Sequence, residues 1–503
     1  MDRNSRQKLS LDKWLQRNSR GTIEAATAYG KTRVGLNALT MLRRKDSSRT
    51  AIIVVPTIVL KSQWENQLNE WGLMENTQVY VINSLIKLTT VNCKFLIIDE
   101  CHRYAAKTFS KIFEVAKYTF ILGLTATMKR LDGKHTLIQK YAPIVDTISL
   151  AYCRAKGYVS QYKEYNLGIN LPQADLIYYQ DKARELGSMM DKFDNDFQTM
   201  LKCSYSNKPQ WSSATHNWFA PHTVIHAQLL GWRGNTVQSA REILELNASR
   251  PRGQKLSVWG GATNEYFHPD KLHGFAVYGM RLTREIKDFI NKHPLKVQNA
   301  LELINKTNYE TITFSENTEV ADDMKSVLGD RAVVYHSNLE SNVEEIEVVK
   351  TYKREESALN FIANNAGWAY KGETDGIHTV GCIKERKVSA KRLKEEAISK
   401  IMNDDTVKVM LTAKALDQGF DYPGAELGII MSRTSNPTQQ IQRTGRVVRK
   451  HTYDDGTEKI GLVVNLYLKD TRDFRKLRGA QKSSVGVIEV NSVDEILTRE
   501  GLK

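Results

Sequence analysis

The chain has 503 residues, too many for one typical hydrophobic core, so we expect two or three domains. Its 41% hydrophobic and 26% charged residues are ordinary for a globular protein, and its formal net charge of +15 fits either a nucleic-acid ligand or a merely basic soluble protein. Five scattered cysteines without a CxxC pair, and no apolar run near the roughly 20 residues of a bilayer span, exclude a disulfide scaffold, a zinc knuckle and a membrane anchor.

Apolar runs alternate with helical stretches from the N-terminus to about residue 150. The pattern predicts strands at 21–27, 51–57, 79–83, 95–100 and 120–127, and helices at 31–44, 59–71 and 107–117. Strands that alternate with helices are typical of a parallel, doubly wound α/β domain.

A candidate phosphate loop, ATAYGKT, lies between the first strand and the first helix. It consists of Ala26, Thr27, Ala28, Tyr29, Gly30, Lys31 and Thr32. Gly30 would let the backbone approach phosphate oxygens, Lys31 would neutralise the β- and γ-phosphates, and Thr32 would offer its hydroxyl to Mg²⁺. The loop departs from the GxxxxGK[ST] pattern because Ala25 replaces the first glycine.

Two acids, Asp99 and Glu100, end the apolar run FLIIDE. Adjacent carboxylates at the end of a buried strand are costly unless a positive group is near, and Mg²⁺ with Lys31 would supply it. Asp99 would hold the Mg²⁺ through its waters, and Glu100 would orient and deprotonate the attacking water. The alternative is a pair of exposed acids at a strand-to-loop transition. The strand context of both motifs favours the catalytic interpretation.

A second series of apolar runs begins near residue 290, with strands expected at 310–316, 331–337, 407–413, 427–432 and 460–467. We therefore expect a first domain at 1–160, an accessory region at 161–290 with a helical start near 176–202, and a second domain at 291–475. An irregular insertion at about 341–388 interrupts the second domain, and 476–503 is a short tail.

The motifs resemble those of superfamily-2 helicases. Asp99-Glu100-Cys101-His102 is similar to the DExH box of that family, and ATAYGKT to its first motif, with Ala28 in place of a glycine. The remaining motifs follow in the family order: VVPTIVLKSQW at 54–64, INSL at 82–85, LTAT at 124–127, TITFSENTEVADDM at 311–324, MLTAKALDQGFDYP at 410–423 and QQIQRTGRVVRK at 439–450. Within the superfamily the style is similar to XPB-like and UvsW-like enzymes, including phage recombination helicases. The resemblance implies two tandem RecA-like α/β domains with an inserted region.

The resemblance also implies roles for residues outside the phosphate loop. Arg446 and Arg449 would act as arginine fingers, and Gln442 would contact the γ-phosphate, although a solvated basic helix face is the alternative. Gly419 and Asp421 would touch the ribose or phosphates, whereas the role of the neighbouring Gln418 stays open because many relatives carry arginine there. Gln7 would read adenine, or it is a plain surface glutamine, since RNSRQ lacks the usual aromatic residue.

Small hydroxyls and a few other side chains stand where the family lines its nucleic-acid track. These are Pro56, Thr57, Lys61, Ser84, Ser315 and Thr412, and each of them fits a structural role about equally well. Thr125 and Thr127 would couple the acid site to domain movement, or are ordinary strand-end hydroxyls. In the accessory region Trp211, Trp218, Trp232 and Trp259 could stack on bases, but core packing is the commoner use of tryptophan.

The leading hypothesis is an ATP- and Mg²⁺-dependent DNA helicase that translocates on DNA and unwinds or branch-migrates forked or recombination intermediates. The rivals are an RNA helicase, a double-strand DNA translocase that does not separate strands, and a nucleic-acid-binding protein with an inactive ATPase. We expect a monomer in the cytoplasm of a bacterium or of a phage-infected host, without membrane association, serving DNA replication, recombination or repair. The intact acids, lysine and arginines argue against an inactive ATPase.

Overall fold

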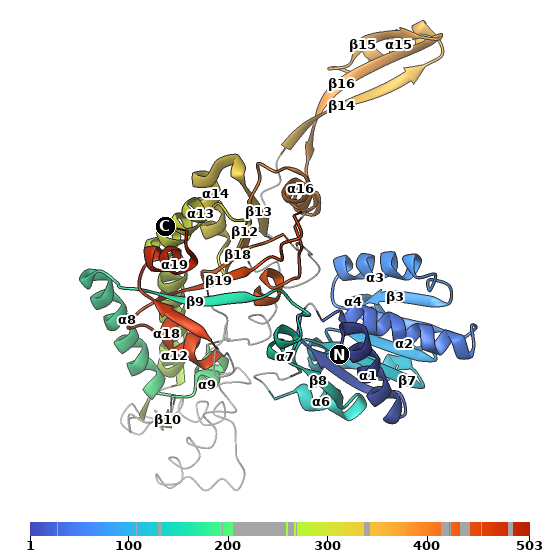
Figure 1. Ribbon diagram of the computed structural model, residues 1–503. Coiled ribbons are helices and arrows are strands. Elements are labelled where there is room, and N and C mark those ends of the chain that lie inside the picture. The colour runs from blue at the N-terminus through green and yellow to red at the C-terminus, as the bar shows by residue number, and fades with distance from the viewer. Residues whose placement is uncertain are drawn as a thin grey trace, which may run out of the picture. The chain divides into compact units, whose positions relative to one another are not determined.

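The computed structural model describes the chain except for residues 28, 107, 129–132, 194, 205–257, 260–265, 268, 337–342, 414–421, 423, 433–442, 454, 481–485 and 503. The chain divides into two compact units. The first comprises Met1–Leu167, Asn299–Leu466 and Ala480–Lys503, and the second comprises Gly168–Gln298 and Tyr467–Gly479. The first unit contains two large sheets, so we call residues 1–160 the first lobe and the second sheet with its helices the second lobe (Figure 1).

The first lobe is a six-stranded sheet in the order β3-β2-β5-β7-β1-β8. Its strands are β1 (Arg20–Ala25), β2 (Ala51–Val55), β3 (Thr77–Val81), β5 (Phe95–Asp99), β7 (Phe120–Thr125) and β8 (Ile144–Ile148), and all neighbours pair in parallel. Its helices are α1 (Arg3–Gln16), α2 (Lys31–Lys45), α3 (Ile58–Glu70), α4 (Ile82–Leu85), α5 (Ile112–Val115), α6 (His135–Tyr141) and α7 (Leu150–Ala155). Strands β2 and β5 are buried along their whole length, as expected for strands covered on both faces.

The second lobe is a seven-stranded sheet in the order β13-β17-β12-β18-β19-β9-β20. Its strands are β9 (Tyr162–Ile169), β12 (Thr311–Ser315), β13 (Ala332–His336), β17 (Val409–Ala413), β18 (Leu427–Ile430), β19 (Gly461–Leu468) and β20 (Val487–Val490). The helices around it include α13 (Pro294–Thr307), α14 (Thr318–Leu328), α16 (Ala390–Asn403) and α19 (Val493–Glu500). The predicted α/β class with parallel sheets is confirmed.

Two segments join the second sheet although the sequence placed them elsewhere. Strand β9 lies in the range assigned to the accessory region, and β20 in the range assigned to the tail. Their apolar pattern is broken by polar residues that bond to one another: Asn465 donates to Glu164 Oε1 at 2.8 Å, and Asn166 donates to Glu489 Oε1 at 2.7 Å. A buried polar ladder of this kind has no signature in local periodicity.

The helix predicted at 107–117 is wrong for most of its length. A 3₁₀ turn covers Phe109–Lys111, α5 covers only Ile112–Val115, and Ala116–Lys117 form the short strand β6, which pairs with β4 (Val91–Asn92). Tertiary pairing therefore overrides local helix propensity at the end of this segment.

The second unit is largely helical. It contains α8 (Gln173–Asp191), α9 (Phe197–Cys203), α12 (Pro269–Lys292), most of α18 (Arg472–Ala480) and the short strands β10 (Val258–Trp259) and β11 (Tyr266–Phe267). An apolar core including Leu186, Met200 and Ile286 joins the long helices. Lys296 and Asp473 form a fully buried ion pair at 2.5 Å. Such a pair is costly to break because the remaining charge would be left buried alone.

The insertion at 341–388 is regular rather than irregular. An antiparallel sheet in the order β14-β16-β15 is formed by β14 (Val343–Tyr352), β16 (Ile377–Lys387) and β15 (Ala369–Thr374), with α15 (Glu355–Ala363) packed on it. Among the described helices of the chain, none is both long and apolar enough to cross a bilayer.

Candidate active site

The phosphate loop connects β1 to α2 at the carboxyl end of the first sheet. Gly30 has φ of 90°, in the left-handed region that favours glycine, and a Cβ there would lie 2.7 Å from Gln7 Nε2. Gly30 caps α2 without a side-chain hydrogen bond, so the first N–H groups of this helix face the loop uncapped. Lys31 Nζ donates to the Ala25 carbonyl at 3.3 Å. This is the cradle expected for phosphate oxygens.

Gln7 lies on α1, directly against the loop. Its side chain is fully buried, and Nε2 donates to the Tyr29 carbonyl at 2.9 Å. Its Oε1 is also buried, and among the described residues nothing donates a hydrogen bond to it. A buried acceptor is costly without a donor, so this atom is suited to receive one from a ligand. The structure thus excludes a plain surface position for Gln7.

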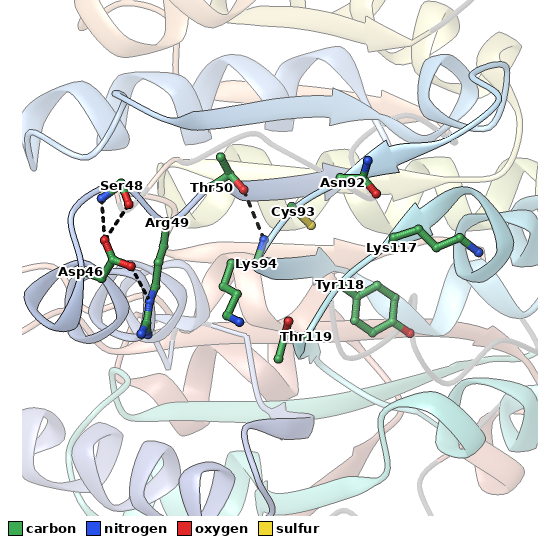
Figure 2. Close-up of a pocket in the computed structure, with 10 residues that line it drawn as sticks. All are labelled: Asp46, Ser48, Arg49, Thr50, Asn92, Cys93, Lys94, Lys117, Tyr118 and Thr119. Carbon is green, nitrogen blue, oxygen red and sulfur yellow. Dashed lines mark hydrogen bonds and ion pairs between the residues drawn. The ribbon is translucent and has the colours of Figure 1, made fainter.

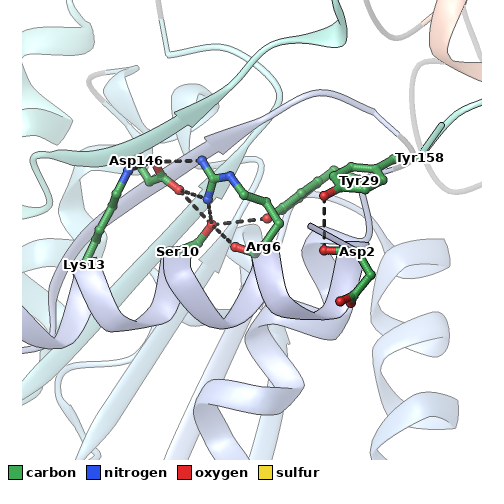
Figure 3. A network of polar contacts seen from close by, with 7 residues as sticks. All are labelled: Asp2, Arg6, Ser10, Lys13, Tyr29, Asp146 and Tyr158. Atoms are coloured by element: carbon green, nitrogen blue, oxygen red, sulfur yellow. Dashed lines mark hydrogen bonds and ion pairs between the residues drawn. The ribbon is translucent and has the colours of Figure 1, made fainter. Parts of the chain in front are cut away.

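A polar network fastens α1 to the sheet (Figure 3). Asp146 on β8 accepts hydrogen bonds from Arg6 Nη1 at 2.6 Å, Ser10 Oγ at 2.7 Å and Lys13 Nζ at 2.6 Å. Burial would raise the pKa of Asp146, but these bonds outweigh it and hold the pKa below its ordinary value. Ser10 Oγ also lies 3.2 Å from the Tyr29 hydroxyl. The network therefore fixes Gln7 relative to the loop.

Asp99 and Glu100 stand at the end of β5 in different environments. Asp99 is buried; its Oδ2 accepts from Trp64 Nε1 at 3.0 Å and its Oδ1 from the Glu100 N–H at 2.9 Å. Burial, and secondarily the charge of Glu100, raise the pKa of Asp99 to about 6, against the opposing effects of Trp64 and Lys31. Glu100 has φ of 48°, a left-handed backbone that costs a non-glycine residue about 1–2 kcal/mol. Strain of this kind is typical of functional sites.

A chain of contacts leads from Glu100 to the LTAT motif. His102 Nδ1 lies 3.4 Å from Glu100 Oε2 and 2.9 Å from Thr125 Oγ1. Thr125 Oγ1 in turn donates to the Thr127 carbonyl at 2.8 Å. These contacts give the predicted coupling of Thr125 and Thr127 to the acids a physical route.

The sequence did not single out Trp64 or His102 as site residues. Trp64 is almost fully buried, and its ring packs on α2, where a Cβ at Gly35 would lie 2.6 Å from Trp64 Cη2. One side chain therefore orients Asp99 and contacts the helix that carries Lys31. Its position at the end of VVPTIVLKSQW was the available signal.

Two arginines of the last motif, Arg443 and Arg446, are buried in the second lobe, and Arg449 is half-buried. Residues 443–447 are helical, and Arg443 fixes them by donating to the Ser432 carbonyl at 2.8 Å and to Glu316 at 3.0 Å. Arg446 is 6% exposed, and burial lowers the pKa of Arg449 to about 10. Within the first compact unit, a Cβ at Gly445 would lie 2.3 Å from Thr27 Cβ, so this motif contacts the phosphate loop.

Four predicted site residues lie outside the described residues: Ala28, Gly419, Asp421 and Gln442. So do Gln418, Trp211, Trp218 and Trp232. Of the residues predicted to line a nucleic-acid track, Pro56, Thr57, Lys61 and Ser84 are at least partly exposed. Thr57 caps α3 by accepting from the Leu60 N–H at 3.3 Å.

The other two predicted track residues are buried. Ser315 donates to the Asn317 carbonyl at 3.0 Å, and Thr412 donates to the Thr313 carbonyl at 2.6 Å. For these two side chains the structure gives a local structural role.

The side chains of this site fit a Mg²⁺ ion that is shared with nucleotide phosphates better than a metal ion that is held by protein side chains alone. Among the described residues, no group of three or more His, Cys, Asp or Glu side chains could hold a metal ion. Mg²⁺ in proteins is commonly held by one or two carboxylates together with substrate phosphates. The five cysteines are free and buried.

The sequence matches two protein-family models and resembles a DNA translocase. The family model "Type III restriction enzyme, res subunit" matches residues 1–91 and 83–130, and "Helicase conserved C-terminal domain" matches residues 374–451. The DNA 3'-5' translocase XPB2 of Sulfurisphaera tokodaii is 22% identical over 487 residues, covering 92% of this chain and 81% of that protein.

Solved structures of two-domain helicases resemble the fold. S. cerevisiae Dbp5 bound to RNA and ADP BeF3 is 12% identical with a TM-score of 0.50, covering 99% of this chain and 92% of that one. The Pyrococcus furiosus Hef helicase domain is 13% identical with a TM-score of 0.42, covering 94% and 98%. The likeness to Dbp5 supports the tandem α/β architecture and, at this identity, the fold alone.

Proposed function

We propose that this chain, which is an ATP-dependent helicase of superfamily 2 and therefore a hydrolase, translocates on DNA and unwinds or branch-migrates forked or recombination intermediates. The observation that carries the choice of DNA is the alignment with a DNA translocase over 92% of the chain. The net charge of +15 supports a polyanionic ligand. The resemblance to phage recombination helicases supports a monomer that serves replication, recombination or repair in the cytoplasm of a bacterial or phage-infected cell.

The residues divide the catalytic work between the two lobes. Lys31 would neutralise the phosphates, and Thr32 and Asp99 would hold Mg²⁺, which when bound would supply further charge neutralisation there. Glu100, whose carboxylate lies 3.4 Å from His102 Nδ1 on a strained backbone, accepts the proton of the attacking water. Gln7 Oε1 accepts from the exocyclic amine of adenine. From the second lobe, Arg446 and Arg449 stabilise charge in the transition state, and Gln442, Gly419 and Asp421 contact the nucleotide.

The helical second unit, with residues 205–265, is the candidate for a DNA-engaging accessory element. Its support is position: it is inserted between the two lobes in sequence, where it could meet a duplex as a strand is pulled. A folded variant lacking 205–265 should keep ATPase activity stimulated by single strands and lose fork unwinding. Full unwinding of branched substrates by that variant would identify the region as a packing insert or a protein-docking surface.

A second candidate function is translocation on duplex DNA without strand separation. It is favoured by the alignment with a protein that is named as a DNA 3'-5' translocase. A substrate panel separates these functions: single strand, blunt duplex, fork, Holliday junction and RNA of matched length, each with ATPase and unwinding readouts. The proposal expects ATPase stimulation by DNA and unwinding of forks or junctions. Stimulation by RNA alone would replace it with an RNA helicase, and movement on duplex without unwinding would replace it with a translocase.

A further inference from the structure

A cavity of about 620 Å³ opens at the edge of the first sheet opposite the phosphate loop (Figure 2). Its lining comes from three segments, at residues 46–50, 92–94 and 117–119, which immediately precede β2, β5 and β7. In a parallel sheet the amino ends of the strands share one edge, which we call the amino edge. Strand β2 has five residues, so the cavity lies roughly 16 Å along the sheet from Pro56 and Thr57 at the carboxyl edge.

The backbone of this cavity is fixed by hydrogen bonds between its three segments. Lys94 N–H donates to the Thr50 carbonyl at 3.0 Å, Cys93 N–H to the Lys117 carbonyl at 2.9 Å, and Thr119 N–H to the Lys94 carbonyl at 3.2 Å. The pairing of β4 with β6 aligns Asn92 with Lys117. The backbone positions of the lining residues are therefore set before any ligand binds, so binding need not order the backbone of these three segments.

The charge of the cavity is positive. Arg49, Lys94 and Lys117 line it, and the lining includes one carboxylate, Asp46. Asp46 is already engaged by Arg49 Nε at 3.3 Å and by Ser48 Oγ at 2.6 Å. Within the described part of the chain, no carboxylate forms an ion pair with Lys94 or Lys117. Lys94 Nζ instead lies 5.6 Å from the Phe120 ring centroid.

A further cation stands beside the cavity. Arg20, the first residue of β1, donates to the Thr119 carbonyl at 3.2 Å and lies over the Tyr118 ring at 5.3 Å. Tyr118 is a lining residue, so this contact extends the positive surface along the amino edge. Arg20, Lys94 and Lys117 are partly or fully exposed, and within the described residues no carboxylate forms an ion pair with them, which favours a ligand with several negative charges spaced along it.

We propose that this cavity binds backbone phosphates of a nucleic-acid segment outside the track at the carboxyl edge. The inference rests on the proposed function for the nature of the ligand, which is a polyanion whose charges are spaced along a strand. Lysine and arginine contacts to phosphates position a strand without reading its sequence. The amino-edge cavity thus serves as a second electrostatic contact for the same nucleic acid.

The test is the salt dependence of DNA binding by the full chain carrying Lys94→Ala and Lys117→Ala. Loss of two phosphate contacts should make the slope of log K against log[salt] shallower by about 1.4 for a single strand or about 1.8 for a duplex. The matched control, Lys140→Ala with Lys156→Ala, removes the same charge elsewhere in the first lobe. Lys140 also lies near an aromatic ring, at 5.9 Å from Tyr141, and Lys156 is exposed. The control should keep the wild-type slope.

Additional variants and ligands distinguish the loss of phosphate contacts from misfolding and from binding of another ligand. Lys94→Arg with Lys117→Arg keeps the charge and should keep the slope, and the Gln pair should repeat the loss if the Ala pair does not fold. A wild-type slope in a folded Ala or Gln pair overturns the inference while leaving the proposed function intact, whereas a wild-type protein that binds neither DNA nor RNA overturns both. If the lysine substitutions weaken binding of a polyglutamate peptide but not of DNA, the ligand of the cavity is an acidic protein instead. If they weaken binding of inorganic phosphate but of neither DNA nor the peptide, the ligand is a free anion.

Discussion

The two edges of the first sheet carry opposite charges in opposite surroundings. At the carboxyl edge two carboxylates, Asp99 and Glu100, are largely removed from solvent, and the charge of Lys31 acts on Asp99. At the amino edge Lys94 and Lys117 are partly or fully exposed, and the one nearby carboxylate, Asp46, is engaged by Arg49. The same strands therefore have a site with buried, interacting charges at their carboxyl ends and a surface with solvent-accessible cations at their amino ends.

The difference reflects what each edge has to do. Chemistry on a bound phosphate needs groups whose orientation is fixed, and the burial of Asp99 together with the strained turn at Glu100 supplies that. Contact with a long polyanion needs only accessible positive charge, which is effective while solvated and is screened by salt. Substitutions at the carboxyl edge should consequently change turnover, and substitutions at the amino edge should change the salt dependence of binding.

The sharpest test of this contrast is Lys31→Ala, which should abolish ATP turnover. Nucleic-acid binding should remain largely intact, because the phosphate loop and the nucleic-acid track are separate surfaces. The control is Lys45→Ala, at the other end of the same helix, where the lysine is exposed. Steady-state ATPase and DNA-binding assays check both variants. Full ATPase activity in Lys31→Ala would refute the assignment of the phosphate loop.

Glu100→Gln should stop hydrolysis while leaving ATP binding in place, since an amide cannot take a proton from water. Single-turnover hydrolysis together with equilibrium nucleotide binding measures the two effects separately. Glu114→Gln, an exposed acid on α5, is the matched control. Normal hydrolysis in Glu100→Gln would show that another group is the base.

Arg446→Ala tests whether the residues at the carboxyl edge of the first sheet can hydrolyse ATP without an arginine from the second lobe. We expect hydrolysis to slow by about 10³- to 10⁵-fold, the contribution typical of arginine fingers, and ATP binding to weaken much less. Arg331→Ala provides the comparison, because Arg331 lies on the surface of the same lobe, where its guanidinium donates to Asn305 Oδ1 at 2.7 Å. Equal losses of binding and turnover in Arg446→Ala would instead assign Arg446 to the ground state or to the fold.

The sequence predicted those parts of the molecule whose information is local. Runs such as FLIID and AIIVV are buried on both faces and were recognisable as strands. The phosphate loop and the two acids were recognisable because each stands at the end of such a run. Parallel pairing of β1 with β7 and of β7 with β5 then places both motifs at one edge.

The parts that the sequence did not predict depend on partners far along the chain. Helix α1 was not predicted, and the network that fastens it joins Arg6 to Asp146, 140 residues away. Strand β9 pairs with β20, more than 300 residues later. The amino-edge cavity likewise collects three short polar segments that have no motif. Non-local pairing of polar residues leaves no periodic pattern, so propensity and spacing could not reveal it.

The smallest expected effect concerns Gln7, the part of the carboxyl edge that binds rather than reacts. Gln7→Ala removes a buried acceptor and should weaken ATP binding by about two- to twelvefold, which corresponds to one hydrogen bond of about 0.5–1.5 kcal/mol. GTP binding should change less, because guanine carries a carbonyl where adenine carries its amine, so the preference for ATP over GTP should fall. Gln16→Ala, an exposed glutamine at the end of the same helix, should leave both affinities unchanged. Equal weakening of ATP and GTP by Gln7→Ala would show that Gln7 only supports the loop through its bond to the Tyr29 carbonyl and does not contact the base.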